Sequence, residues 1–154
     1  METYSLDQTD KDILRCLQKN ARISIKALAL TVHKSQSPIQ LRLKRLEQLG
    51  YIRSYITQLD YNKIRVYILA YVQIKLREHS MGLLEQFNEE MVSIQEVQEC
   101  SQTAGLFDFM LKICVTDIQA YHQLIKDLIT KPNIEQVVSS IVLNQGKNEN
   151  NWSF

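Results

Sequence analysis

The spacing of apolar residues changes once along this chain, and this change limits the possible folds more than any other feature. Up to about residue 50, apolar side chains recur every three or four positions, as on one face of an α-helix. A strict every-second-residue pattern, typical of a half-buried strand, then covers Val66, Ile68, Ala70, Val72, Ile74 and Leu76. The sequence therefore predicts an α+β protein with domains over 1–60 and 61–147 and a tail over 148–154.

Three helices are expected in the N-terminal domain. Asp7 and Ser24 are good N-caps for the first two, and Ser35 or Ser37 for the third. Gly50 follows the last apolar residue of the third helix, as is common just past a helix C-terminus. Two helices joined by a three-residue turn, the second longer and more basic, are typical of a helix-turn-helix.

Strands are expected from there on. Residues 51–59 favour a strand that would begin a small wing beside the helix-turn-helix. After the alternating strand, periodicity predicts a helix at 83–91 and two strands, at 95–103 and 106–115, that are joined by a hairpin. A second helix between Asp117 and Lys131 and a last strand at 134–145 follow. The order βαββαβ predicts a ferredoxin-like arrangement.

The second face of the first alternating strand bears on assembly. It begins with Tyr67, Leu69 and Tyr71 and is largely apolar. Two helices can cover only one face of a four-stranded sheet, so the other face would leave an apolar patch exposed. We therefore expect a homodimer that forms through the sheets.

Charge divides unevenly between the two domains. Residues 1–60 hold ten basic and six acidic side chains, a net charge of +4, whereas the rest of the chain holds eight basic and eleven acidic ones. The whole chain carries only +1, which argues against a uniformly basic nucleic-acid-binding protein. The segregation instead predicts that the first domain meets a polyanion.

Composition excludes several other classes of function. The four glycines are scattered and form neither a GxGxxG nor a Walker-type phosphate loop. The three cysteines, Cys16, Cys100 and Cys114, show no CxxC spacing. The first residues lack the apolar run of a signal peptide, and no apolar span of transmembrane length follows. We expect no cofactor, no metal site, no membrane segment and a cytoplasmic location.

At the level of motifs, the chain resembles one family in both halves. LDQTDKDILRCLQKNARISIKALAL and SQSPIQLRLKRLEQLGYI are similar to the DNA-binding domain of Lrp/AsnC (feast/famine) regulators. VQECSQTAGLFDFMLKI and VVSSIVLNQGK resemble the C-terminal ligand-sensing domain of that family. The resemblance runs in family order from about Leu6 to Lys147.

This resemblance implies a sequence-specific DNA-binding transcriptional regulator, associated with the nucleoid, and not an enzyme. It implies double-stranded DNA and a small effector as partners, the effector being an amino acid. It also implies homodimers that assemble into a higher oligomer such as an octamer.

The sequence departs from the family pattern at a few positions. His33 stands where the turn of the helix-turn-helix usually has Gly; the position needs a positive φ, which His tolerates better than most residues. The other departures are Tyr61 and Arg65 in the linker, Leu106 in the sensor loop, and Val137 and Val138 in the last strand.

The third helix carries the candidate DNA contacts. Gln36, Ser37, Gln40 and Lys44 lie opposite its apolar stripe, and Leu41 borders them, so these five are candidates for base contacts in the major groove. Three basic side chains, Lys34, Arg42 and Arg45, are better placed for phosphates, and Ser35 is a further candidate for contact with DNA. A solvated basic helix face is the alternative interpretation of the same pattern.

The candidate effector contacts lie at the hairpin and on the last strand of the second domain, at Gly105, Leu106, Phe107, Asp108, Ser139 and Ser140. A carboxylate could meet an ammonium group, and hairpin amides or a serine hydroxyl could receive a carboxylate. Leu106 favours an apolar effector such as leucine or methionine. Alternatively, Gly105 only makes a turn and Asp108 only satisfies local backbone amides.

Two other functions stay open at this point. One is an architectural, weakly sequence-selective DNA organiser without an effector, which the departures at Leu106, Val137 and Val138 would suit. The other is a haem-pathway decarboxylase, since enzymes of that class resemble this two-domain fold. The basic, Ser- and Gln-bearing third helix argues against the enzyme.

Overall fold

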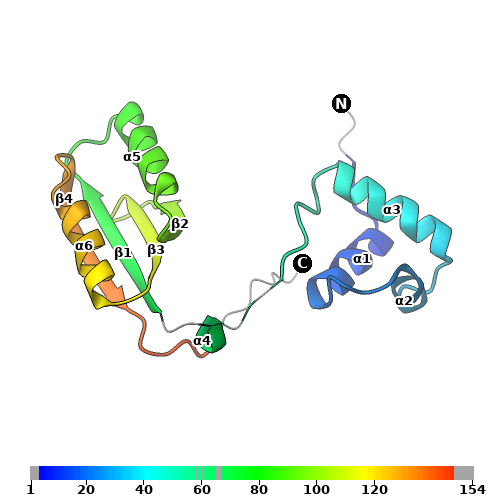
Figure 1. Cartoon of the computed structure of the whole chain (residues 1–154). Helices are drawn as coiled ribbons and strands as arrows, with labels where there is room; N and C mark the ends of the chain where they lie inside the picture. Colours follow the sequence, from blue (N-terminus) through cyan, green and yellow to red (C-terminus); the bar gives the residue numbers. More distant parts are fainter. Residues whose placement is uncertain (1–3, 58, 60, 65–66, 148–154) are drawn as a thin grey trace. The chain divides into compact units, whose positions relative to one another are not determined.

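The chain divides into two compact units that separate near residue 58, close to the boundary predicted at residue 60 (Figure 1). This computed structural model describes residues 4–57, 59, 61–64 and 67–147. The predicted tail over 148–154 lies outside the described residues. Each unit has its own buried cluster of apolar side chains.

The N-terminal unit consists of three helices, α1 (Gln8–Lys19), α2 (Ile25–Thr31) and α3 (Gln36–Gln48). Their apolar stripes meet in a small core made by Ile13, Leu28, Ala29, Ile39 and Leu46. This confirms the predicted helix-turn-helix, with α2 and α3 as its two helices.

The predicted helix ends are also confirmed. Asp7 caps α1 through a capping box, in which its carboxylate accepts from the Asp10 N–H at 2.8 Å. Ser24 caps α2 by accepting from the Ala27 N–H at 3.2 Å. In the turn between α2 and α3, His33 has a φ of 54°, the left-handed conformation in which the family usually places glycine.

The wing strand expected at 51–59 is absent from residues 51–57 and 59, which the structure shows without strand pairing. A strand needs a neighbouring strand for its backbone hydrogen bonds, and the elements around it in this unit are helices. Instead, the Tyr55 hydroxyl donates to Glu47 of α3 at 2.7 Å. Burial, and then this hydrogen bond, raises the pKa of Tyr55 to about 12. The linker also forms a short helix, α4 (Tyr61–Ile64), which the sequence did not predict.

The C-terminal unit has the predicted βαββαβ order. Its elements are β1 (Ile68–Leu76), α5 (Met81–Ser93), β2 (Val97–Gln102), β3 (Phe109–Val115), α6 (Ile118–Ile129) and β4 (Ile134–Ile141). The strands form one antiparallel sheet in the order β2-β3-β1-β4, which is ferredoxin-like (Figure 1). β4 ends four residues earlier than predicted, because Ile141 already pairs with Ala70 near the start of β1.

Both long helices pack on one face of this sheet. Ala70, Val72 and Ile74 of β1 point to that face and join a core with Phe87 of α5 and Leu128 of α6. The other face carries a mixture of side chains. It includes Leu69, which is buried, the half-exposed Tyr71 and Met110, and the polar Gln73 and Lys112. This face is less apolar than the sequence led us to expect, and the dimer stays a prediction.

Candidate functional sites

A row of side chains along α3 faces away from the core of the N-terminal unit. Ser37, Leu41, Lys44 and Gln48 follow one another at three- and four-residue steps, so they share one side of the helix. All four are exposed, and Leu41 keeps 71% of its surface accessible. A leucine at the centre of a polar row has no folding role there, but it suits contact with a thymine methyl group.

The sequence interpretation found most of this row and missed Gln48. The signal was present in the helical spacing, since Gln48 lies one turn beyond Lys44. Gln36 and Gln40 are also exposed and flank the row. The structure therefore places the five predicted base-reading residues on the accessible side of α3.

The start of α3 borders an open hollow of about 480 Å³. Ser35 occupies the N-cap position but makes no capping hydrogen bond with its side chain, so the first amides of α3 are not satisfied by it. The lining residues come from α2, the turn and α3, and they are Lys26, Ala29, Leu30, Lys34, Ser35, Gln36 and Ser37. Two lysines beside a helix N-terminus favour an anion such as a phosphate. The sequence analysis missed Lys26, because α2 brings it to the start of α3 only when the two helices pack together.

Arg45 is exposed near the other end of α3. Its guanidinium carbon lies 5.4 Å from the centre of the Tyr4 ring, within range of a cation–π contact. The Tyr51 hydroxyl donates to the Tyr4 carbonyl at 2.9 Å. These contacts hold the guanidinium beside the helix and leave it accessible.

Arg42 differs from its predicted place. The sequence assigned it to a phosphate, but its Nη1 donates to Asp7 Oδ2 at 2.6 Å and to Asp10 Oδ1 at 2.8 Å. The pKa of Asp7 is lowered first by the Asp10 N–H and then by Arg42. The pKa of Arg42 is raised, first by Asp10 and then by Asp7. The guanidinium is thus paired with two carboxylates at the start of α1.

In the C-terminal unit, Asp108 fastens the hairpin between β2 and β3 to the end of β1. Its Oδ2 accepts from the Leu76 N–H at 2.7 Å, and its Oδ1 lies 3.1 Å from Nε2 of His79. Its backbone carbonyl accepts from the Thr103 N–H at 2.8 Å. The carboxylate therefore already has protein partners, but the backbone amide among them, that of Leu76, is distant in sequence and not local as the alternative interpretation expected. The sequence analysis named neither His79, which is distant from Asp108 in sequence, nor Thr103, which faces it across the hairpin.

The remaining predicted effector residues do not form one cluster. Leu106 is 74% exposed on the hairpin, beside the exposed Gly105 and the partly buried Phe107. Ser139 and Ser140 point to opposite faces of the sheet, since they pair with Val72 and Tyr71 respectively. Ser139 lies on the helix-covered face, where its Oγ is hydrogen-bonded to the Tyr121 hydroxyl. Ser140 lies on the helix-free face.

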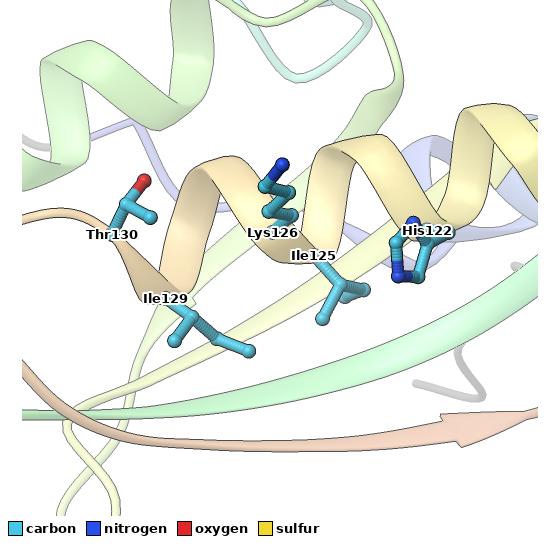
Figure 2. Close-up of a pocket in the computed structure, with 5 residues that line it drawn as sticks. All are labelled: His122, Ile125, Lys126, Ile129 and Thr130. Carbon is cyan, nitrogen blue, oxygen red and sulfur yellow. The ribbon is translucent and has the colours of Figure 1, made fainter.

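A second hollow, of about 300 Å³, lies on α6 and is open to solvent. Figure 2 shows the lining side chains projecting from this helix and its end, at His122, Ile125, Lys126, Ile129 and Thr130. None of the predicted effector residues lines it. Side chains from one helix do not surround a small molecule, so this hollow does not define an effector site.

The part of the chain that the structure describes contains neither a metal-binding cluster nor a membrane-spanning helix. No three or more His, Cys, Asp or Glu side chains there are grouped so as to hold a metal ion. No helix there is long and apolar enough to cross a membrane.

The chain is similar in sequence to known regulators along nearly its whole length. Residues 6–53 match the family model described as winged helix-turn-helix DNA-binding, and residues 69–152 match the Lrp/AsnC ligand binding domain. It is 34% identical to the leucine-responsive regulatory protein of Klebsiella pneumoniae, over 94% of this chain and 89% of that protein. It is also 34% identical to the proline dehydrogenase transcriptional activator of Rhizobium radiobacter, over 95% and 94% of the two chains.

Solved structures agree. A transcriptional regulator from Neisseria meningitidis, crystallised as a complex with L-methionine, superposes with a TM-score of 0.89 at 29% identity and covers 97% of each chain. An AsnC family regulator from Agrobacterium tumefaciens has a TM-score of 0.88 at 31% identity, over 96% of this chain and 97% of that one.

Together with these relatives, a helix-turn-helix unit with an exposed α3 and a ferredoxin-like unit identify a DNA-binding transcriptional regulator rather than an enzyme. More specifically, this chain belongs to the Lrp/AsnC family of transcriptional regulators. The resemblance stated from the motifs is confirmed, and the decarboxylase alternative is set aside.

Proposed function

We propose that the exposed row of α3 reads base edges in the major groove. The observation that carries this proposal is the accessible side of α3, where a leucine and polar side chains stand opposite the buried Ile39 and Leu46. Gln40 and Gln36 suit adenine, Lys44 suits guanine, Leu41 suits the thymine methyl group, and Ser37 accepts several bases.

The phosphate contacts come from residues around this row. Lys34, Ser35 and Arg45 are exposed at the two ends of α3, and Lys26 joins Lys34 at the hollow beside the helix N-terminus. Such contacts fix the register of the helix on DNA without reading sequence. Arg42 is left out of this set because its guanidinium binds two carboxylates.

The functional unit in this proposal is a homodimer, which places two copies of α3 in successive major grooves of a pseudo-palindromic site. The helix-free face of the sheet supports it, since Tyr71, Met110 and Val138 each leave more than a third of their surface accessible there. Dimers assemble further into a higher oligomer such as an octamer, and the protein associates with the nucleoid.

The effector in this proposal is an amino acid with an apolar side chain, such as leucine or methionine. The exposed Leu106, with Gly105 and Phe107, supplies an apolar loop, and Ser140 a hydroxyl on the helix-free face. Asp108 holds the loop in place, and Ser139 is assigned to packing of α6. The names of the relatives, one leucine-responsive and one bound to L-methionine, support this choice.

Fluorescence anisotropy tests the proposal. The full-length protein is titrated onto the DNA upstream of its own gene and onto a scrambled duplex, at low and moderate salt. A preference that persists at moderate salt supports a sequence-specific regulator, whereas equal, salt-sensitive binding supports the architectural organiser. A thermal-shift panel of amino acids then tests the effector, and no response to any of them contradicts it.

A further inference from the structure

Arg42 lies on the side of α3 that turns toward α1. It follows Ile39 by three residues and precedes Leu46 by four, so it borders the buried stripe of the helix. Only 34% of its side-chain surface is accessible, whereas Leu41 and Lys44 on the DNA-facing row are exposed. Its position on the helix therefore points away from the groove that the row would enter.

The partner of Arg42 is a fully buried carboxylate. Asp10 has no accessible side-chain surface and accepts from three donors: the Tyr4 hydroxyl at 2.7 Å, the Asp7 N–H at 3.2 Å and Arg42 at 2.8 Å. Burying a charge without a compensating cation is costly, so the guanidinium is needed where it is. Arg42 thereby joins the middle of α3 to the capping box at the start of α1.

The local charge argues against a phosphate contact. One guanidinium faces two carboxylates, so Arg42, Asp7 and Asp10 together carry a net charge of −1. A phosphate approaching Arg42 would also approach Asp7, whose side chain is half exposed. Like charges at such distances repel each other.

We propose that Arg42 is a positioning residue: it sets the angle of α3 against α1 through Asp7 and Asp10, and it neutralises no phosphate. This inference rests on the proposed contact between the exposed row of α3 and DNA. A change at Arg42 then tilts the row, so it alters discrimination between sequences and leaves the number of neutralised phosphates unchanged.

The test uses the double variant Asp10→Asn/Arg42→Met, which removes the buried charge together with its cation, so that no buried charge is left uncompensated; Asp7, which keeps its charge, is half exposed. Anisotropy is measured on the preferred and the scrambled duplex over a range of salt concentrations. We expect the ratio of the two affinities to fall about tenfold, the loss of one good base contact. We expect the slope of log affinity against log salt to stay at the wild-type value.

Lys34→Ala, beside the start of the same helix, is the matched control. Because Lys34 is assigned to a phosphate, its removal is expected to lower the slope by about 0.9. For the double variant, a slope lowered by that amount overturns the proposal, because Arg42 would then be a phosphate ligand. An unchanged ratio of affinities also overturns it, because Arg42 would then position nothing that reads sequence.

A readout without DNA separates this inference from the proposed function. Hydrogen exchange of the α3 amides is compared between wild type and the double variant, with the α6 amides as the internal control. Faster exchange in α3 with unchanged exchange in α6 is expected, and exchange in α3 equal to that of wild type overturns the positioning role. If wild type shows no preference for any duplex while α3 still loosens in the variant, the proposed DNA contact fails and the coupling of α3 to α1 stands.

Discussion

The two units of this regulator differ in whether the polar side chains at their candidate sites have hydrogen-bond partners within the protein. On α3, the side chains of Ser37, Gln40 and Lys44 project from a helix whose other side is core, without a hydrogen bond to any described residue. At the hairpin of the C-terminal unit, Asp108 is instead satisfied by Leu76 and His79. In our proposal, the N-terminal unit therefore carries its whole DNA-binding surface in one chain. The C-terminal unit presents a stable loop and a partly apolar sheet face, which in our proposal become functional on assembly.

The first prediction tests whether the two units are stabilised independently, by a substitution in the core of one of them. Leu46→Ala empties a fully buried site in the N-terminal unit, and such truncations cost about 2–5 kcal/mol. Because the two cores are separate, we expect this unit to unfold early and DNA binding to be lost, while the C-terminal unit keeps its own transition. Differential scanning calorimetry and circular dichroism measure both.

Leu128→Ala is the mirror control, since Leu128 is buried in the core of the C-terminal unit. It should lower the other transition and leave the N-terminal one in place. A single transition that shifts equally in both variants would show that the units fold as one.

The second prediction concerns the loop. Asp108→Ala removes the acceptor of the Leu76 N–H, and leaving a buried donor without its partner costs about 1–3 kcal/mol. We expect faster hydrogen exchange at Leu76 and weaker response to an amino-acid effector, with DNA affinity preserved. His79→Ala should have a smaller effect, about 0–1 kcal/mol, because His79 is half exposed. Equal effects of the two variants would contradict the role given to the Leu76 hydrogen bond.

The third prediction compares an exposed lysine of each unit by its effect on the salt dependence of DNA binding. Lys34→Ala removes an exposed cation beside the start of α3, and loss of one phosphate contact lowers the salt slope of DNA binding by about 0.9. Lys126→Ala removes an exposed lysine from α6 and serves as control. We expect it to leave the slope unchanged. Equal slopes for both variants would remove Lys34 from the interface.

The fourth and smallest effect is one of pH. The folded-state pKa of Asp7 lies below its ordinary value of 3.8, first because of the Asp10 N–H and then because of Arg42. The resulting stabilisation is complete above that value and is lost as pH falls through the lower, folded-state pKa. The N-terminal unit of Asp7→Asn should therefore show a shallower loss of thermal stability below about pH 4 than wild type. Parallel pH profiles would contradict this.

Local features of the fold were predictable from the sequence because their causes are local. Caps at Asp7 and Ser24, and the positive φ of His33, depend on residues within one turn of the chain. The partners of Arg42 were not predictable, because Asp7 and Asp10 lie more than thirty residues away and meet it only when α1 packs on α3. Its position beside the buried stripe of Ile39 and Leu46 could have been found from helical spacing, but the sequence analysis used only its charge.

The spread of the predicted effector residues and the absence of the expected wing strand from the described residues have other origins. Ser139 and Ser140 are neighbours in a strand, and alternation alone places them on opposite faces, so the sequence already argued against a shared site. The strand expected at 51–59 had suitable residues but no partner strand among the described elements of its unit. Propensity indicates what a segment can form, whereas pairing depends on its neighbours.

The central claim is that the exposed row of α3 reads DNA sequence, and selection of bound duplexes from a random pool tests it most directly. Wild type and Gln40→Ala are compared, with Lys34→Ala as the phosphate control. The account predicts that Gln40→Ala relaxes the preference at one position of each half-site, by about 1–3 kcal/mol. Lys34→Ala should weaken binding and keep the preferred sequence. The same preferred sequence, equally sharp, for wild type and Gln40→Ala would contradict the account.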